Sequence, residues 1–158
     1  MWYYKGEILE DGFKPKEVDH GFVYLIEISD PETGEQKKYI GCKKFWSTRT
    51  LPPLKGKKRK RKVTKESDWR KYHSSSETLK KWVKEGVECK RTMLQIVSSQ
   101  WELNYVENKL IMLSDACLKD EYRNGIVNLR QSLPPKQLKE DFDNGVVDYN
   151  FIDLMETL

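Results

Sequence analysis

Two tyrosines lie in a segment whose residue pattern predicts a β-hairpin. The first strand, "FVYLIEI", carries Tyr24, and the second, "QKKYIGC", carries Tyr39, with the turn sequence "DPETGE" between them. We centre the turn between Glu32 and Thr33. Tyr24 then faces Gly41, and Tyr39 is the diagonal neighbour of Tyr24 on the same face of the sheet. Strand tyrosines are most often packing residues with a hydrated hydroxyl, and this alternative stays open for both.

Phenols in this arrangement could act as bases in a hydrolytic reaction if a cation lies beside them. A tyrosine with the ordinary pKa of about 10 is a poor base, and a neighbouring positive charge lowers that pKa. Lys43 and Lys44 follow the second strand and could supply this charge. The two histidines, His20 and His73, fit no catalytic triad or zinc spacing, and His73 is a weak candidate for proton transfer.

One glutamate falls within the apolar stripe of a predicted helix. In "SSQWELNYVENKLIMLSDA", Ser99 and Glu102 have the spacing of a capping box, and apolar residues follow at helical intervals. At about 100° per residue, Glu107 lies inside the apolar arc. A carboxylate there is costly unless a cation, a hydrogen-bond donor or a metal pairs with it. Glu107 is therefore either a functional ligand or a structural partner of Lys109 or of a surface arginine.

A dense basic run occupies residues 55–65, "KGKKRKRKVTK". It holds 8 of the 29 lysines and arginines and no acid, which leaves 21 bases against 25 acids elsewhere in the chain. Such a run predicts a solvated loop or a segment that a polyanion orders, and clustered cations bind nucleic-acid phosphates through counterion release. A merely solubilising loop, an anionic membrane surface and a targeting signal are the alternatives. The candidate DNA-binding residues are Lys55, Lys57, Lys58, Arg59, Lys60, Arg61, Lys62 and Lys65, with Tyr72 and His73 beyond the run.

Length and composition narrow the class of protein. A chain of 158 residues fits one domain that needs no disulfides for stability. The three cysteines lack any CxxC or Cys/His spacing that could hold zinc, so they are expected to be reduced thiols. No segment has the length of apolar sequence that a membrane span needs, and the N-terminus lacks the pattern of a signal peptide. We therefore expect a cytoplasmic protein that does not bind membranes.

The order of the predicted elements favours an α+β fold. We expect a small, mainly antiparallel sheet made of the hairpin and a third strand, "CKRTMLQIV", flanked by helices. One helix should begin near the serines at 74–76 and end at Gly86, and a turn or short helix should precede Pro52 and Pro53. The predicted organisation is an N-terminal arm (1–20), a central domain (21–130) with the basic insertion at 55–65, and an acidic C-terminal extension (131–158).

Taken together, these residues resemble the GIY-YIG nuclease family. The half-motifs are "FVY" at 22–24 and "YIG" at 39–41, and the family's arginine, ten residues after the second tyrosine, falls on Arg49. Glu107 matches the family's metal-binding glutamate on a later helix. The asparagine that follows this helix is Asn124 in "EYRNG" or Asn128 in "IVNLR". The resemblance covers about residues 21–128, and "MWYYKGE", the lysine-rich insertion and "ESDWRKY" are similar to small enzymes of this family encoded by tailed bacteriophages.

The resemblance implies a DNA endonuclease that depends on Mg²⁺ or Mn²⁺ and acts in the cytoplasm of a bacterial host, either homing-like or DNA-degrading. It implies that Tyr24 is the general base, that Tyr39 positions water or phosphate, and that Arg49 clamps the scissile phosphate. Glu107 would hold the metal ion against the leaving 3′ oxygen, and Lys43 or Lys44 would activate the base. DNA is the expected partner, and a homodimer is one expected assembly.

The sequence also departs from the family pattern. Cys42 stands where a lysine often follows "YIG", and "YHSSS" stands where phage relatives read "YYGSN". A non-catalytic nucleic-acid-binding module that uses the basic run is the main alternative. Its tyrosines would only pack, and Glu107 would have no purpose near a phosphate. A host-interaction protein that uses its acidic tail, residues 140–156, is a third and less supported reading.

Overall fold

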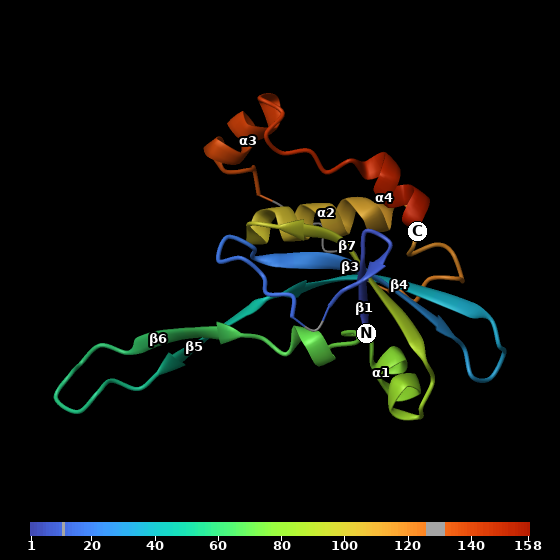
Figure 1. Ribbon diagram of the computed structural model, residues 1–158, viewed down its shortest axis with the longest axis horizontal. Coiled ribbons are helices and arrows are strands. Elements are labelled where there is room, and N and C mark those ends of the chain that lie inside the picture. The colour runs from blue at the N-terminus through green and yellow to red at the C-terminus, as the bar shows by residue number, and fades with distance from the viewer. Residues whose placement is uncertain (11, 126–131) are drawn as a thin grey trace.

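The computed structural model describes residues 1–10, 12–125 and 132–158. A mixed five-stranded sheet with strand order β2-β1-β7-β3-β4 forms the centre of the molecule (Figure 1). Its strands are β1 (Trp2–Tyr4), β2 (Glu7–Ile8), β3 (Gly21–Ser29), β4 (Gln36–Lys44) and β7 (Cys89–Val97). The predicted α+β fold is therefore confirmed, as are the hairpin, β3 and β4, and the third strand, β7.

The register of the hairpin is the one expected from its turn. Tyr24 lies opposite Gly41 and Ile26 lies opposite Tyr39, so Tyr24 and Tyr39 are diagonal neighbours. The pairing of β3 with β7 shifts register between Val23 and Tyr24, which marks a β-bulge beside the first tyrosine. Bulges increase the local twist and change the direction of a side chain, and they are common next to active sites.

The first twenty residues add two strands to the sheet. Strand β1 pairs with β7 in parallel and with β2 in antiparallel orientation, so the sheet is mixed, although three of its four pairings are antiparallel. Trp2 is buried and its indole N–H donates to the carbonyl of Trp69 at 3.1 Å. Burial of this large side chain anchors the N-terminal strands on the body.

Both faces of the sheet are covered, which explains why nearly all of β3 is apolar and buried. On one face, α2 (Gln100–Leu113) packs over Val23 and Ile40, and α4 (Phe151–Thr157) packs beside α2 (Figure 1). On the other face lies a cluster of aromatic and aliphatic side chains. Its members include Trp2, Phe22, Tyr24, Phe45, Trp69, Leu79 and Trp82.

The helices begin and end where sequence signals indicate. α1 (Glu77–Lys84) is followed by Gly86 with φ of 93°, and Ser99 caps α2 by accepting from the backbone N–H of Glu102 at 3.2 Å. A short 3₁₀ helix, η1 (Trp69–Lys71), and α3 (Lys136–Asp143) complete the set in the described part of the chain. None of the helices among these residues is long and apolar enough to cross a membrane.

The prediction of a turn or short helix before Pro52 and Pro53 is wrong. Residues Trp46–Leu51 form β5, and Arg61–Glu66 form β6, so part of the predicted solvated loop is a strand. The two strands form an antiparallel hairpin that projects from the body (Figure 1). The β-branched Thr48, Thr50 and Val63 suit an extended backbone, and the prolines end this strand rather than a helix.

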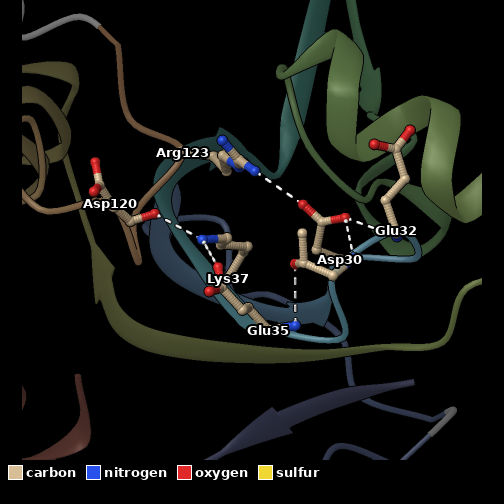
Figure 2. Close-up of polar contacts among 7 residues, drawn as sticks. Asp30, Glu32, Glu35, Lys37, Asp120 and Arg123 are labelled. Carbon is tan, nitrogen blue, oxygen red and sulfur yellow. Dashed lines mark hydrogen bonds and ion pairs between the residues drawn. The ribbon is translucent and has the colours of Figure 1, made fainter.

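The turn of the β3–β4 hairpin is tied to the chain that follows α2. Asp30 accepts from the backbone N–H of Glu32 at 2.9 Å and from Arg123 at 3.0 Å, as Figure 2 shows. Lys37 donates to Glu35 at 2.6 Å and to the carbonyl of Asp120 at 3.2 Å (Figure 2). These contacts hold the segment 120–124 along the outer edge of β4.

Candidate active site

The hydroxyl of Tyr24 lies directly over Gly41. A Cβ atom built on Gly41 would stand 2.4 Å from the Tyr24 hydroxyl oxygen, 2.6 Å from Cζ and 2.8 Å from a ring carbon of Tyr39. No side chain larger than hydrogen fits there unless a buried ring moves. The glycine of "YIG" is thus required by the close approach of the two tyrosines, whose ring centroids lie 6.3 Å apart.

A third tyrosine, Tyr72, completes this group. Its ring meets that of Tyr24 edge-on with the centroids 6.0 Å apart, and the Nζ atom of Lys43 lies 3.8 Å from the centroid of the Tyr72 ring. Lys43 also donates to Asp68 at 2.6 Å, and the Tyr39 hydroxyl lies 2.7 Å from the Ser75 hydroxyl. We call Tyr24, Tyr39, Tyr72 and Lys43 the tyrosine cluster. The sequence suggested Tyr72 only for DNA binding, and it gave no signal for Asp68 or Ser75.

The Tyr24 side chain is fully buried, and its hydroxyl has no hydrogen-bond partner of acceptable geometry among the described residues. Burial raises the pKa of Tyr24 well above its ordinary value, and the neighbouring phenols of Tyr72 and Tyr39 raise it further. Burial also raises the pKa of Tyr39, and the charge of Glu107 adds to this effect. With their pKa values raised, both phenols stay protonated and cannot accept a proton, so catalysis would need a positive charge brought close to them.

Glu107 approaches the hairpin from the opposite face of the sheet. The Cys42 thiol donates to Oε2 of Glu107 at 3.2 Å, and the Cys42 side chain packs with the α2 side of the core. Burial raises the pKa of the Glu107 carboxyl, although the hydrogen bonds from Cys42 lower it. Burial and the charge of Glu107 both raise the pKa of Cys42, so this thiol stays protonated. Lys109, the structural partner considered from the sequence, instead donates to the Tyr105 hydroxyl at 3.4 Å.

The surroundings of Glu107 are compatible with a divalent cation. Its carboxylate is partly desolvated and its described hydrogen-bond donors all belong to Cys42, so a cation would relieve the cost of its burial. No group of three or more His, Cys, Asp or Glu side chains suited to a metal gathers within the described residues. Mg²⁺ is commonly held by one or two carboxylates, with waters and substrate phosphates as further ligands, so a single carboxylate fits.

Asn124 continues the ladder of β4 with its side chain. Along the free edge of β4, the backbone N–H of Lys38 donates to the carbonyl of Glu121 at 2.7 Å, and the backbone N–H of Arg123 donates to the carbonyl of Lys38 at 2.8 Å. The Asn124 amide then accepts from the Ile40 N–H at 3.0 Å and donates to the Ile40 carbonyl at 2.7 Å. Because both amide groups are engaged, Asn124 fixes the "YIG" segment. Asn128, the alternative considered from the sequence, lies outside the described residues.

Arg49 lies apart from the tyrosines. It is exposed on β5, and none of the contacts among the described residues joins it to Tyr24, Tyr39 or Glu107. It does line an open groove of about 1420 Å³ between the projecting hairpin and the end of β4. Cys42, Lys43 and Lys44 line the same groove, as does Lys65 of the basic run.

The remaining candidates fall into two places. The basic run forms the tip and the second strand of the projecting hairpin, so Lys55, Lys57, Lys58, Arg59, Lys60, Arg61, Lys62 and Lys65 all lie on one arm. His73 lies near Arg91. Burial, together with the charge of Arg91, lowers the pKa of His73, so it carries little positive charge for a phosphate at neutral pH.

Comparison with known proteins identifies the family. The family model described as "Putative endonuclease segE, GIY-YIG domain" matches residues 2–128. No curated protein and no solved structure matches the chain. The match spans the five-stranded sheet, the tyrosine cluster, the projecting hairpin and Glu107. The chain therefore belongs to the segE-type GIY-YIG endonuclease domain family, as its half-motifs indicated.

Proposed function

We propose that the protein is a divalent-metal-dependent endonuclease that hydrolyses phosphodiester bonds in DNA. The observation that carries this proposal is the buried hydroxyl of Tyr24, which lies over Gly41 beside the Tyr72 phenol and makes no hydrogen bond of good geometry among the described residues. A buried hydroxyl without a good hydrogen bond costs up to about 1–3 kcal/mol, and a module that only binds DNA would gain nothing from it. A hydrolase gains a phenol that is ready to meet a water molecule or a phosphate oxygen.

Tyr24 is the proposed general base and Tyr39 the residue that positions the water or the phosphate. The raised pKa of Tyr24 means that the base must be activated. Lys43 is the cation of the tyrosine cluster, but in this structure Asp68 neutralises it. Lys44 is exposed on the Cys42 side of β4, where its charge opposes the rise in the pKa of Cys42. We therefore favour Lys43, released from Asp68 as DNA enters, as the group that lowers the pKa of Tyr24.

Glu107 is the proposed ligand for Mg²⁺ or Mn²⁺. A bound ion would stabilise charge on the leaving 3′ oxygen. Cys42 positions the carboxylate through its hydrogen bond, in place of the lysine found in many relatives. Asn124 is proposed as a positioning residue for "YIG". The division of the chain at residues 20 and 130, the cytoplasmic location and a homodimer remain predictions, and the molar mass in solution tests the last of these.

The test is cleavage of supercoiled plasmid by the purified protein in Mg²⁺, with EDTA as the metal-free control. Tyr24→Phe keeps the ring that packs in the core, so it should fold and should cut at least about 100-fold more slowly if the hydroxyl is the base. Tyr3→Phe, on strand β1 between β2 and β7, is the matched control and should cut at the wild-type rate. If Tyr24→Phe also cuts at that rate, the tyrosine cluster is structural and the proposed mechanism is wrong.

A further inference from the structure

The β5–β6 hairpin, which we call the arm, carries two unpaired cations near its stem. In the ladder of the arm, Arg49 lies opposite Val63, two positions before Lys65 on β6. Because side chains alternate along a strand, Arg49 and Lys65 are diagonal neighbours on the same face, about 7–8 Å apart and within reach of each other's long side chains. Neither side chain makes a hydrogen bond or an ion pair with another residue in the described part of the chain. We call these two residues the stem cations.

The stem holds Lys65 and its neighbour in a defined position. Ser67, two residues after Lys65, donates its backbone N–H to the carbonyl of Phe45 at 2.7 Å, and the Phe45 side chain is fully buried. On the other strand, the Trp46 indole donates to the carbonyl of Asp19 at 2.8 Å. The tip of the arm, by contrast, extends away from the body (Figure 1). A group that acts on a reacting phosphate must be held in place, and only the stem of the arm meets this requirement.

The stem cations line the groove that leads to the candidate active site. Lys43 and Lys44 at the end of β4 line the same groove. Cys42 lines it as well, and the Cys42 thiol donates to Glu107, the proposed metal ligand, at 3.2 Å. A DNA backbone that lies in this groove would therefore meet the stem cations on one side and the tyrosine cluster and Glu107 on the other.

Three acidic residues also line the groove, and two of them are already neutralised. Asp68 pairs with Lys43 at 2.6 Å, and Glu66 pairs with Arg70 at 2.9 Å. Glu17 is the third and is exposed. None of the three carboxylates pairs with a stem cation. Two like charges at this spacing repel each other, and a phosphate between them would remove that repulsion.

We propose that Lys65 is a second clamp on the scissile phosphate and binds one of its non-bridging oxygens beside Arg49. The inference rests on the proposed function and adds a catalytic residue to it. The family pattern expects Arg49 at this phosphate, and the register of the arm places Lys65 next to it. As water attacks phosphorus and the bond to the 3′ oxygen breaks, negative charge builds up on the non-bridging oxygens. Cations held where this charge develops stabilise the transition state more than the bound substrate.

The other basic residues of the arm are placed differently. Lys62 lies opposite Thr50, on the face away from the stem cations, and it does not line the groove. Arg61 shares their face but lies four residues farther from the stem than Lys65, which is about 13 Å along a strand. These residues suit phosphates away from the cleavage point. Such contacts contribute to DNA affinity and leave the rate of the bound complex to the stem.

The test separates the rate of cleavage from the affinity for DNA. Lys65→Gln, Lys65→Arg and Lys62→Gln are compared with the wild type, and Lys139→Gln, at an exposed position on α3, is the control for the loss of one charge. DNA affinity is measured by titration in Ca²⁺. Plasmid nicking in Mg²⁺ is followed with the protein in excess and at saturating concentration, so that weaker binding does not lower the observed rate.

The two glutamine variants on the arm should differ in rate and not in affinity. Each removes one phosphate contact, so both should bind DNA more weakly and to a similar extent. At saturation, Lys65→Gln should cut at least about tenfold more slowly than Lys62→Gln, because it alone removes a charge from the developing oxyanion. Lys65→Arg keeps that charge and should keep most of the wild-type rate. Lys139→Gln should bind and cut as the wild type does.

Two results would overturn the clamp. If Lys65→Gln cuts at the rate of Lys62→Gln, Lys65 holds only a neighbouring phosphate. If Lys65→Arg is as slow as Lys65→Gln, the charge at this position is not what accelerates cleavage. In both cases a wild type that cuts plasmid leaves the proposed function standing. A wild type that cuts no plasmid in Mg²⁺ would refute the proposed function, and the clamp with it.

Discussion

Replacing Asn124 should destabilise the protein through the edge of β4. The Asn124 amide is buried and makes two hydrogen bonds to the backbone of Ile40, at 3.0 and 2.7 Å. Asn124→Ala removes both and leaves a buried N–H and a buried carbonyl without partners. Each such loss costs about 1–3 kcal/mol, so the free energy of unfolding should fall by about 2–6 kcal/mol. At about 2–4 °C per kcal/mol for a chain of this size, the melting temperature should fall by at least about 4 °C.

The variant Asn124→Asp tests the two hydrogen bonds one at a time. An ionised carboxylate can accept from the Ile40 N–H but repels the Ile40 carbonyl, whereas a protonated carboxyl can accept and donate as the amide does. The buried site favours the protonated form, so this variant should approach the wild-type melting temperature as the pH falls toward 4. Asn104→Ala, which removes only a surface contact to Gln100, is the control and should melt within about 2 °C of the wild type. An Asn124→Ala protein that melts like the wild type would refute the proposed role of this amide.

Three further predictions follow from the site and the arm. Gly41→Ala should lower the free energy of unfolding, measured by thermal melting, by about 1–3 kcal/mol, because its Cβ would stand 2.4 Å from the Tyr24 hydroxyl. Gly12→Ala, which has open space around it, should melt as the wild type does. The pKa of the Glu107 carboxyl is higher in the folded protein than in the unfolded chain. The stability that this difference contributes is therefore fully present below the pKa of the unfolded chain, and it is lost as the pH rises through the pKa of the folded protein. Without metal, Glu107→Gln should therefore melt at or above the wild-type temperature at pH 7, with the difference closing toward pH 4, and only the wild type should gain stability from Mg²⁺. Earlier melting of this variant at pH 7 would instead indicate a structural ion pair. Changing the basic residues at the tip of the arm to Gln should flatten the slope of log DNA affinity against log salt concentration. The slope should change by about 0.9 for each phosphate that the arm no longer neutralises. An unchanged slope would mean that these residues do not touch DNA. The residues to change are Lys57, Lys58, Arg59, Lys60, Arg61 and Lys62.

Local sequence patterns predict the hairpin, its register and the two principal helices correctly. These elements rest on local rules, because turn residues, alternation and capping boxes act over a few positions. The turn in "DPETGE" set Tyr24 opposite Gly41, and the Ser99 cap began α2 where its capping box predicted. The half-motifs likewise predicted the family that the comparison then identified.

The contacts among the site residues depend on long-range packing, which local sequence patterns do not encode. Tyr72 joins Tyr24 through packing that no spacing along the chain encodes, and Asp68 neutralises Lys43 across a separation of 25 residues. The role of Asn124 was equally hidden, because its amide replaces a backbone group of a neighbouring strand.

The structure of the basic run, residues 55–65, also depends on a long-range partner. Its composition predicted a solvated loop, yet strand pairing with β5 orders half of it as β6. Strand formation depends on a partner strand, and residues 55–65 carry no local sign of theirs. Composition therefore indicated what the run could bind, whereas the fold decided that Arg49 and the lysines share one arm.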